Sequence, residues 1–142
     1  LFNIFGTLTS GYLSTKYPKK LILSFIYLMR GVVIALFIFL PPSPTLAVLF
    51  GITFGFLWLA TVPPTAGIVG SIFGTKYMGL LYGMVFLSHQ VGSFFGAYLG
   101  GVFKEVYGSY DYAWYVSIAL SIFAGLIHLP IKEKQVKRLQ IA

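Results

Sequence analysis

Residues 21–40 read LILSFIYLMRGVVIALFIFL, a stretch in which the only charged residue is Arg30. A helix needs about 20 mainly apolar residues to cross the hydrocarbon core of a bilayer. This stretch has that length, and it lacks the alternating pattern over about 10 residues that marks a strand of a membrane β-barrel. We therefore predict a spanning helix over 21–40 and an all-α fold.

The composition extends this prediction to the whole chain of 142 residues. Hydrophobic residues make up 58%, charged residues only 9%, and the mean hydropathy is +0.88. A soluble domain of this length has too little interior to bury so much apolar surface. The composition excludes a soluble globular enzyme, a disordered chain and a nucleic-acid-binding protein. A polytopic transmembrane helix bundle remains, in contact with the lipid bilayer.

Further apolar segments flank the first one. We predict the end of a helix over 1–13 and spanning helices over about 45–66, 78–103 and 112–130, in addition to 21–40. The chain starts with Leu1 inside an apolar run, with no basic segment before it, so we expect a fragment cut within a helix, or an incomplete sequence, rather than a signal peptide.

The charges predict the orientation of this bundle, because alternate connections lie on the same side of a membrane. The loops over 14–20 and 67–77 and the tail over 131–142 carry eight basic residues, and the other side carries one, Lys104. The eight are Lys16, Lys19, Lys20, Lys76, Lys132, Lys134, Lys137 and Arg138. The positive-inside rule makes their side, and the C-terminus, cytoplasmic. The net charge of +7 is then a topology signal.

The opposite side is rich in aromatic residues of the kind that line membrane interfaces. These are Tyr107, Tyr110, Tyr112, Trp114 and Tyr115. Their position agrees with the orientation that the basic residues predict.

The first basic loop carries a motif. Residues 11–20 read GYLSTKYPKK, which resembles the signature loop G-x-L-x-D-R-x-G-R-K of the major facilitator superfamily of transporters. The positions that match in type are Gly11, Leu13, Lys16, Lys19 and Lys20. Thr15 replaces the acid and Pro18 the glycine, which fits the degenerate copy of the motif between the family's helices eight and nine and argues against a charge relay through Thr15.

A glycine pattern in 78–103 resembles the motif of the family's helix five, whose repeat partner is helix eleven. Its members are Gly83, Gly92, Gly96, Gly100 and Gly101, with Ala97 in place of a proline. Gly92, Gly96 and Gly100 lie four apart on one helical face, so another backbone can approach them closely.

The resemblance covers essentially the whole chain. The runs over 57–65, 73–79, 88–92 and 107–111 look like those of bacterial permeases related to monocarboxylate transporters. This resemblance implies the C-terminal portion of a twelve-helix fold, the end of helix eight followed by helices nine to twelve. The expected function is secondary transport of a small organic solute, such as a monocarboxylate or other organic anion, by alternating access in the bacterial inner membrane. The expected partners are the N-terminal half, outside this sequence, and a coupled proton. The alternative is a small non-transporting membrane protein, or a truncated permease that acts as an assembly partner.

Polar residues inside the apolar segments are the candidates for the transport pathway. Arg30 lies near the middle of its segment, where an arginine costs about 2.5–3.5 kcal/mol on insertion scales, so it must have a partner or water. One interpretation is a counter-charge for an anionic substrate. The other is a strut that hydrogen-bonds a neighbouring helix, for example the carbonyls freed by Pro63 and Pro64.

Five more residues join Arg30 as candidates: His89, Gln90, Trp58, Thr61 and Asn3. The resemblance places His89 and Gln90 on a helix that lines the cavity, where a histidine can exchange a proton and a glutamine can bond a carboxylate. Trp58 and Thr61 precede the two prolines, where a bend can gate the pathway, and Asn3 lies on the first segment. Each can instead have only a packing or hydrogen-bonding role.

Chemistry other than transport has no support in the sequence. The chain has three acidic residues, all outside the predicted spanning helices, and its two histidines are 39 positions apart, so zinc spacing is absent. No G-x-x-x-x-G-K-[ST] loop is present. We expect no enzyme activity, no metal and no cofactor.

Overall fold

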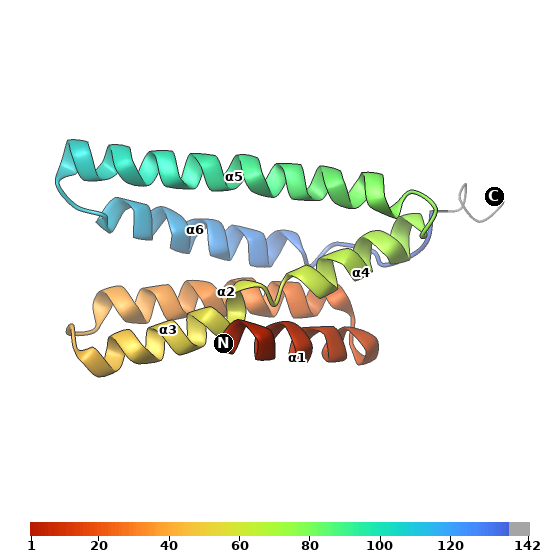
Figure 1. Cartoon of the computed structure of the whole chain (residues 1–142), viewed down its shortest axis with the longest axis horizontal. Coiled ribbons are helices and arrows are strands. Elements are labelled where there is room, and N and C mark those ends of the chain that lie inside the picture. The colour runs from red at the N-terminus through yellow and green to blue at the C-terminus, as the bar shows by residue number, and fades with distance from the viewer. Residues whose placement is uncertain (137–142) are drawn as a thin grey trace.

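The computed structural model describes residues 1–136 as a two-layered bundle of helices (Figure 1). The helices are α1 (Phe2–Lys16), α2 (Lys19–Phe39), α3 (Pro44–Trp58), α4 (Val62–Phe73), α5 (Met78–Tyr107) and α6 (Asp111–Ile127). The first three helices form one layer, α5 and α6 form the other, and α4 crosses between them. α2 packs along α6 and so joins the layers. No strand occurs within residues 1–136.

Local sequence explains where these helices begin and end. The Ser43 hydroxyl accepts a hydrogen bond from Leu46 N at 3.1 Å and Pro44 occupies the first turn, a combination that starts α3. Gly74 and Gly108 follow α4 and α5 with φ of 76° and 70°, a region that glycine enters without steric cost.

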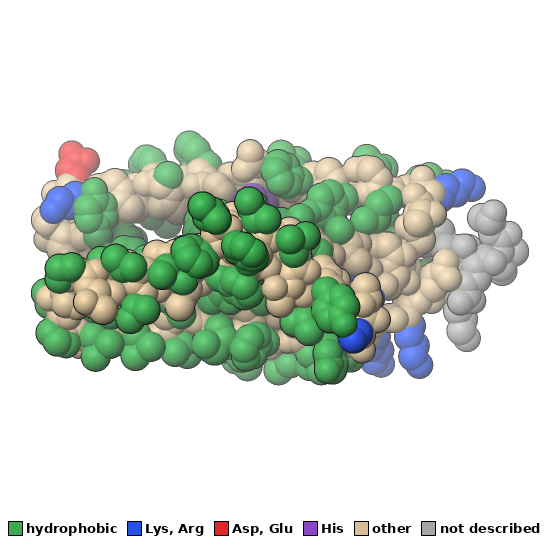
Figure 2. All heavy atoms as spheres, turned by 60° about the horizontal axis from the view of Figure 1, so that its bottom comes forward, with side chains coloured by type: hydrophobic (Ala, Val, Ile, Leu, Met, Phe, Trp, Pro, Cys, Tyr) green, Lys and Arg blue, Asp and Glu red, His purple; other side chains and the backbone are tan. Residues whose placement is uncertain are grey.

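The interior of the bundle is small and its surface is apolar. Ile22, Ile26, Leu57 and Ala60 form a buried cluster, whereas many large hydrophobic side chains on every helix are exposed. Figure 2 shows hydrophobic side chains over the length of the molecule and most of the visible Lys and Arg side chains toward one end. Such a continuous apolar surface marks a protein that contacts lipid or other proteins.

Two stretches are long and apolar enough to cross a bilayer, by length and composition. They are Lys19–Phe39, which is α2, and Pro44–Phe73, which spans α3 and α4 together. α6 is a shorter apolar helix. α5 has 30 residues, about 45 Å at 1.5 Å per residue, but is not among the apolar candidates.

The third predicted segment differs from the observed helices. Instead of one helix over 45–66 followed by a loop over 67–77, α3 ends at Trp58 and α4 runs from Val62 to Phe73. Pro63 and Pro64 have no N–H, so a continuous helix leaves the carbonyls of Leu59 and Ala60 without donors, and the chain turns there. We call residues 59–61 the α3–α4 break.

Other boundaries move by a few residues. α1 continues to Lys16 rather than 13, and α5 continues to Tyr107 rather than 103, so Lys104 and Glu105 lie on its last turn and not in a loop. Lys16, Lys104 and Glu105 are good helix formers that carry no apolar signal, so each helix continues past the end of its apolar run.

One end of the bundle holds most of the described lysines, and we call it the lysine-rich end. They are Lys16, Lys19, Lys20, Lys76, Lys132 and Lys134, at the adjoining ends of α1, α2, α4 and α5 and in the tail. Residues 131–136 run across this end, where the Glu133 carboxylate accepts a hydrogen bond from Lys20 N at 2.7 Å. Val136 N donates to Ile72 O at 3.0 Å. Lys137 and Arg138 lie outside the described residues.

Candidate solute site between α2, α5 and α6

Arg30, in the middle of α2, hydrogen-bonds the backbone just before the α3–α4 break. Its Nε donates to Leu57 O at 3.2 Å, and its Nη2 donates to Leu57 O at 2.5 Å and also to Trp58 O. These carbonyls end α3, where the last turn has no N–H partners of its own. The arginine therefore donates to backbone carbonyls at the end of α3 that would otherwise be unpaired beside the middle of α2.

Asn3 supports the same backbone from α1. Its Oδ1 accepts a hydrogen bond from Leu59 N at 2.8 Å. Arg30 supplies donors for the carbonyls of Leu57 and Trp58, and Asn3 supplies an acceptor for the N–H of Leu59. The two side chains thus pair both carbonyl and N–H groups of residues 57–59. We call Arg30, Asn3 and this backbone the break clamp.

Two other candidates lie next to the break clamp. Thr61 precedes α4, and its carbonyl accepts hydrogen bonds from Thr65 N at 3.1 Å and Thr65 Oγ1 at 2.7 Å. The ring of Trp58 lies 6.0 Å from Cζ of Arg30, and the ring of Tyr27 lies 5.3 Å from the same atom. Cation–π attraction from two aromatic rings helps to hold a guanidinium away from water.

Arg30 also borders a hollow of about 450 Å³ between α2, α5 and α6. Its lining consists of Tyr27, Arg30, His89, Gly92, Ser93, Leu120, Ser121, Phe123 and Ala124. One permanent cation, one imidazole and two serine hydroxyls thus border the same space, within an otherwise apolar wall. We call it the polar hollow. A concave apolar site with a few convergent polar groups is the usual form of a small-molecule site.

The structure brings Arg30 and His89 to this hollow although they are distant in sequence. Tyr27, Ser93 and Ser121 are lining residues that the sequence analysis did not select. Ser93 follows His89 by four positions and donates to His89 O at 3.0 Å, a helical spacing that places both on one face. Tyr27 precedes Arg30 by three positions, a spacing that likewise places both on one face of α2. Ser121 had no comparable signal, because its position depends on how α2 and α6 pack.

Of the remaining predicted residues on α5, Gly92 also lines the polar hollow. Gln90 is not among the lining residues of the polar hollow. A Cβ added at Gly83, Gly92, Gly96, Gly100 or Gly101 would have nothing within 4 Å in the part of the chain that the structure describes. A close helix approach at these glycines therefore stays a prediction.

The signature-loop residues serve packing and the lysine-rich end. A Cβ added at Gly11 would lie 3.7 Å from Pro63 Cβ, and Leu13 packs against the buried cluster. Lys19 Nζ lies 3.8 Å from a Glu133 oxygen, and Lys20 Nζ donates to Leu129 O at 2.9 Å. Lys16 Nζ lies 4.6 Å from the centre of the Tyr12 ring.

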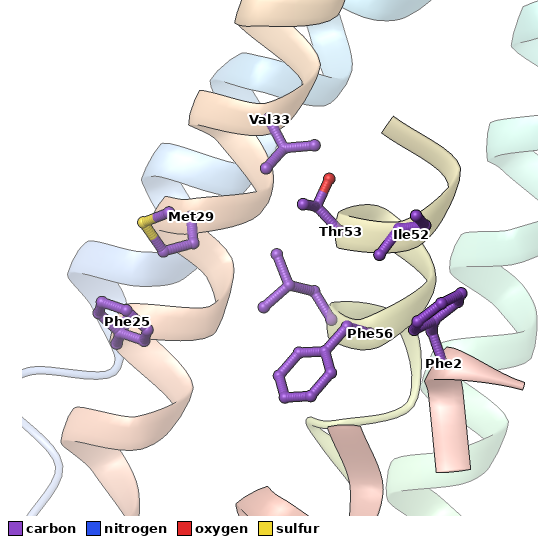
Figure 3. Close-up of a pocket in the computed structure, with 8 residues that line it drawn as sticks. Phe2, Phe25, Met29, Val33, Ile52, Thr53 and Phe56 are labelled. Carbon is purple, nitrogen blue, oxygen red and sulfur yellow. The ribbon is translucent and has the colours of Figure 1, made fainter. Parts of the chain in front are cut away.

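A second hollow, of about 270 Å³, lies between α1, α2 and α3 (Figure 3). Its lining consists of Phe2, Phe25, Met29, Val33, Ile52, Thr53, Phe56 and Leu57. The Thr53 hydroxyl donates to Leu49 O, within its own helix. This hollow has no charged group to orient a polar solute, so the polar hollow is the better candidate site.

The chain matches one known protein family. The family model described as Major Facilitator Superfamily matches residues 1–140. No curated protein and no solved structure matches the chain. The match extends over almost the whole sequence, and the helical fold with two apolar spans agrees with an integral membrane protein. The chain belongs to the Major Facilitator Superfamily, a family of membrane transporters.

Proposed function

We propose that this chain forms part of a secondary transporter that moves a small organic anion, with the polar hollow as its solute site. The observation that carries the proposal is the position of Arg30, a permanent cation at the middle of a spanning helix and in the wall of a hollow that also contains His89. Charged residues at this depth are costly and are typical of substrate and ion pathways.

The hydrogen-bond inventory of Arg30 leaves room for an anion. A guanidinium has five N–H groups, of which one on Nε and two on Nη2 contact Leu57 O and Trp58 O. The two N–H groups of Nη1 have no hydrogen-bond partner among residues 1–136. A carboxylate oxygen is a strong acceptor for such donors.

The other polar groups favour a monocarboxylate over a larger polyanion. The polar hollow has one arginine, and its hydroxyls on Ser93 and Ser121 suit a hydroxyl or carbonyl of the solute. His89 offers a group that can exchange a proton, which suits cotransport with H⁺. We propose alternating access as the mechanism, with this site near the midplane of a bacterial inner membrane.

Uptake of a labelled monocarboxylate into proteoliposomes tests the proposal. We expect Arg30→Ala to raise the solute concentration that gives half-maximal uptake about 10- to 100-fold. The reason is that losing a hydrogen bond to a charged group costs roughly 1.5–3 kcal/mol. His89→Ala should abolish the dependence of uptake on a pH gradient. Ser88→Ala is the matched control, because the Ser88 hydroxyl donates to Met84 O on its own helix and Ser88 does not line the polar hollow. Uptake unchanged in both variants would remove the two residues from the pathway.

The N-terminal half of the transporter is the partner that we propose for α5. None of the 30 residues of α5 is buried by residues 1–136, and its glycine face can accept another helix closely. The native mass distinguishes this from a small assembly protein. A mass near 15.7 kDa favours the assembly protein, and a mass of about 40 kDa or more favours a two-half transporter.

A further inference from the structure

We infer that Arg30 is a shared donor through which a carboxylate in the polar hollow controls the bend between α3 and α4. The inference rests on the proposed function, because it assumes that the hollow binds a small organic anion. It adds a coupling between that site and the break clamp, two features that have Arg30 in common.

The carbonyls that Arg30 occupies have a second possible set of donors. In a continuous helix the carbonyl of residue i accepts from the N–H of residue i+4, so Leu57 O would pair with Thr61 N, and Trp58 O with Val62 N. In the bent chain Val62 N donates to Leu59 O at 3.0 Å instead. Arg30 and the backbone therefore compete for the same two acceptors.

The prolines do not prevent this exchange. Pro63 and Pro64 remove the donors for Leu59 O and Ala60 O only, two residues beyond the acceptors that Arg30 uses. The break can thus gain one more helical turn. In that arrangement the carbonyls of residues 57 and 58 accept from backbone N–H groups of residues 61 and 62, and the guanidinium no longer bonds them. The segment has two discrete arrangements, which is what a coupled switch requires.

The geometry of a carboxylate decides which arrangement it favours. A carboxylate binds a guanidinium most strongly with two parallel N–H···O bonds, on an edge that includes Nη2. Nη2 now donates to Leu57 O and Trp58 O. Two parallel bonds on the Nη1–Nη2 edge therefore displace Trp58 O, and two on the Nε–Nη2 edge displace Leu57 O, so either arrangement opens the clamp at one carbonyl. A carboxylate therefore favours the straighter segment, whereas a single-atom anion such as chloride can bind Nη1 and leave the clamp closed.

The chain is well suited to a direct test, because it contains no cysteine. Val48 on α3 and Phe73 at the end of α4 are 61% and 37% exposed, so cysteines there can carry spin labels. We expect sodium lactate to move the distance between the two positions toward about 38 Å, the length of 25 steps of a straight helix at about 1.5 Å each. Sodium chloride at equal ionic strength should leave it unchanged.

Two variants identify the cause of any shift. Arg30→Lys keeps the charge but lacks the planar fork, so it should lose the lactate response. Ser121→Ala leaves the break clamp intact and removes a hydroxyl from the polar hollow, so it should raise the half-maximal lactate concentration several-fold without changing the distance in chloride.

The outcomes separate the inference from the proposed function. Lactate that binds, by equilibrium dialysis, without changing the distance overturns the coupling and leaves the solute site standing. An equal shift in chloride and lactate also overturns the coupling, because charge alone would then explain it. Absence of both binding and shift overturns the carboxylate site together with the coupling.

Discussion

At the scale of single residues, Arg30 joins the break clamp to the polar hollow. A guanidinium in the middle of an apolar helix needs hydrogen-bond acceptors, and the sequence suggests carbonyls near Pro63 and Pro64. The structure pairs it with Leu57 O and Trp58 O, two residues before the carbonyls that the prolines deprive of donors. Which carbonyl lies within reach depends on how α2 packs against α3, and no local pattern encodes that packing.

Removing the guanidinium should destabilise the fold as well as the solute site. In Arg30→Met the side chain keeps much of its apolar stem, but the carbonyls of Leu57 and Trp58 lose their donors. An unpaired buried acceptor costs about 1–3 kcal/mol. We expect a lower unfolding midpoint in detergent by circular dichroism, with Lys104→Met as the control, since the Lys104 ammonium bonds Gly108 O at the exposed end of α5. Equal midpoints would show that the clamp contributes little to stability.

At the scale of elements, apolar length predicted the helices better than their ends. The prediction over 21–40 lies within two residues of α2, because both ends of that run meet prolines. The helix expected over 45–66 is divided, although the same prolines were visible in the sequence. A proline permits a kink or a complete break, and the contacts of Arg30 and Asn3 with residues 57–59 favour the break here.

The crossing of α1 and α3 gives a sharp prediction at this scale. A Cβ added at Gly6 would collide with the backbone carbonyl of Phe56, which cannot move as a side chain can. We expect Gly6→Ala to destabilise the protein by about 1–3 kcal/mol, the usual cost of overpacking, measured as a shift of the unfolding midpoint.

The matched control for this variant is Gly51→Ala on α3, where nothing lies within 4 Å of an added Cβ. This change should be neutral or stabilise by about 0.5–1 kcal/mol, because alanine favours a helix interior over glycine. Similar effects of the two alanines would contradict a tight α1–α3 crossing.

The tail should act as a cap for α2. Pro18 supplies no side-chain cap, and Glu133, 113 residues away from Lys20, accepts the Lys20 N–H. A carboxylate at a helix N-terminus also interacts favourably with the helix dipole. We expect Glu133→Ala to accelerate trypsin cleavage after Lys132 and Lys134 several-fold, as residues 131–136 leave the bundle end. Glu105→Ala is the control, because Glu105 lies at the opposite end. Unchanged cleavage would mean that the tail is held mainly by Val136 N and Ile72 O.

At the scale of the whole molecule, the sequence predicted the class of protein more completely than the site. Composition and apolar length point to a membrane bundle, because they depend on the solvent and not on which helices touch. The polar hollow needs α2, α5 and α6 to meet, so Ser121 on α6 gave no usable signal, whereas helical spacing relates Ser93 to His89 and Tyr27 to Arg30. His89 and Arg30 were selected separately, each as a polar residue in an apolar run, and their shared location is a result of tertiary packing.

The orientation of the bundle is the last prediction, and it belongs to the molecule as a whole. The described lysines other than Lys104 lie at one end, and Glu105 and Asp111 lie at the other. The positive-inside rule makes the lysine-rich end cytoplasmic. Because the chain contains no cysteine, Lys134→Cys and Glu105→Cys each provide one thiol at an exposed position of opposite ends.

A membrane-impermeant maleimide reads out this orientation in intact bacterial cells that express each variant. We expect the Glu105→Cys protein to be labelled directly, and the Lys134→Cys protein only after the membrane is permeabilised. The unsubstituted chain should remain unlabelled under both conditions. Labelling of Lys134→Cys in intact cells, with protection of Glu105→Cys, would show that the bundle has the opposite orientation. The single basic residue Lys104 would then outweigh the lysines of the opposite end, contrary to the charge rule on which the orientation rests.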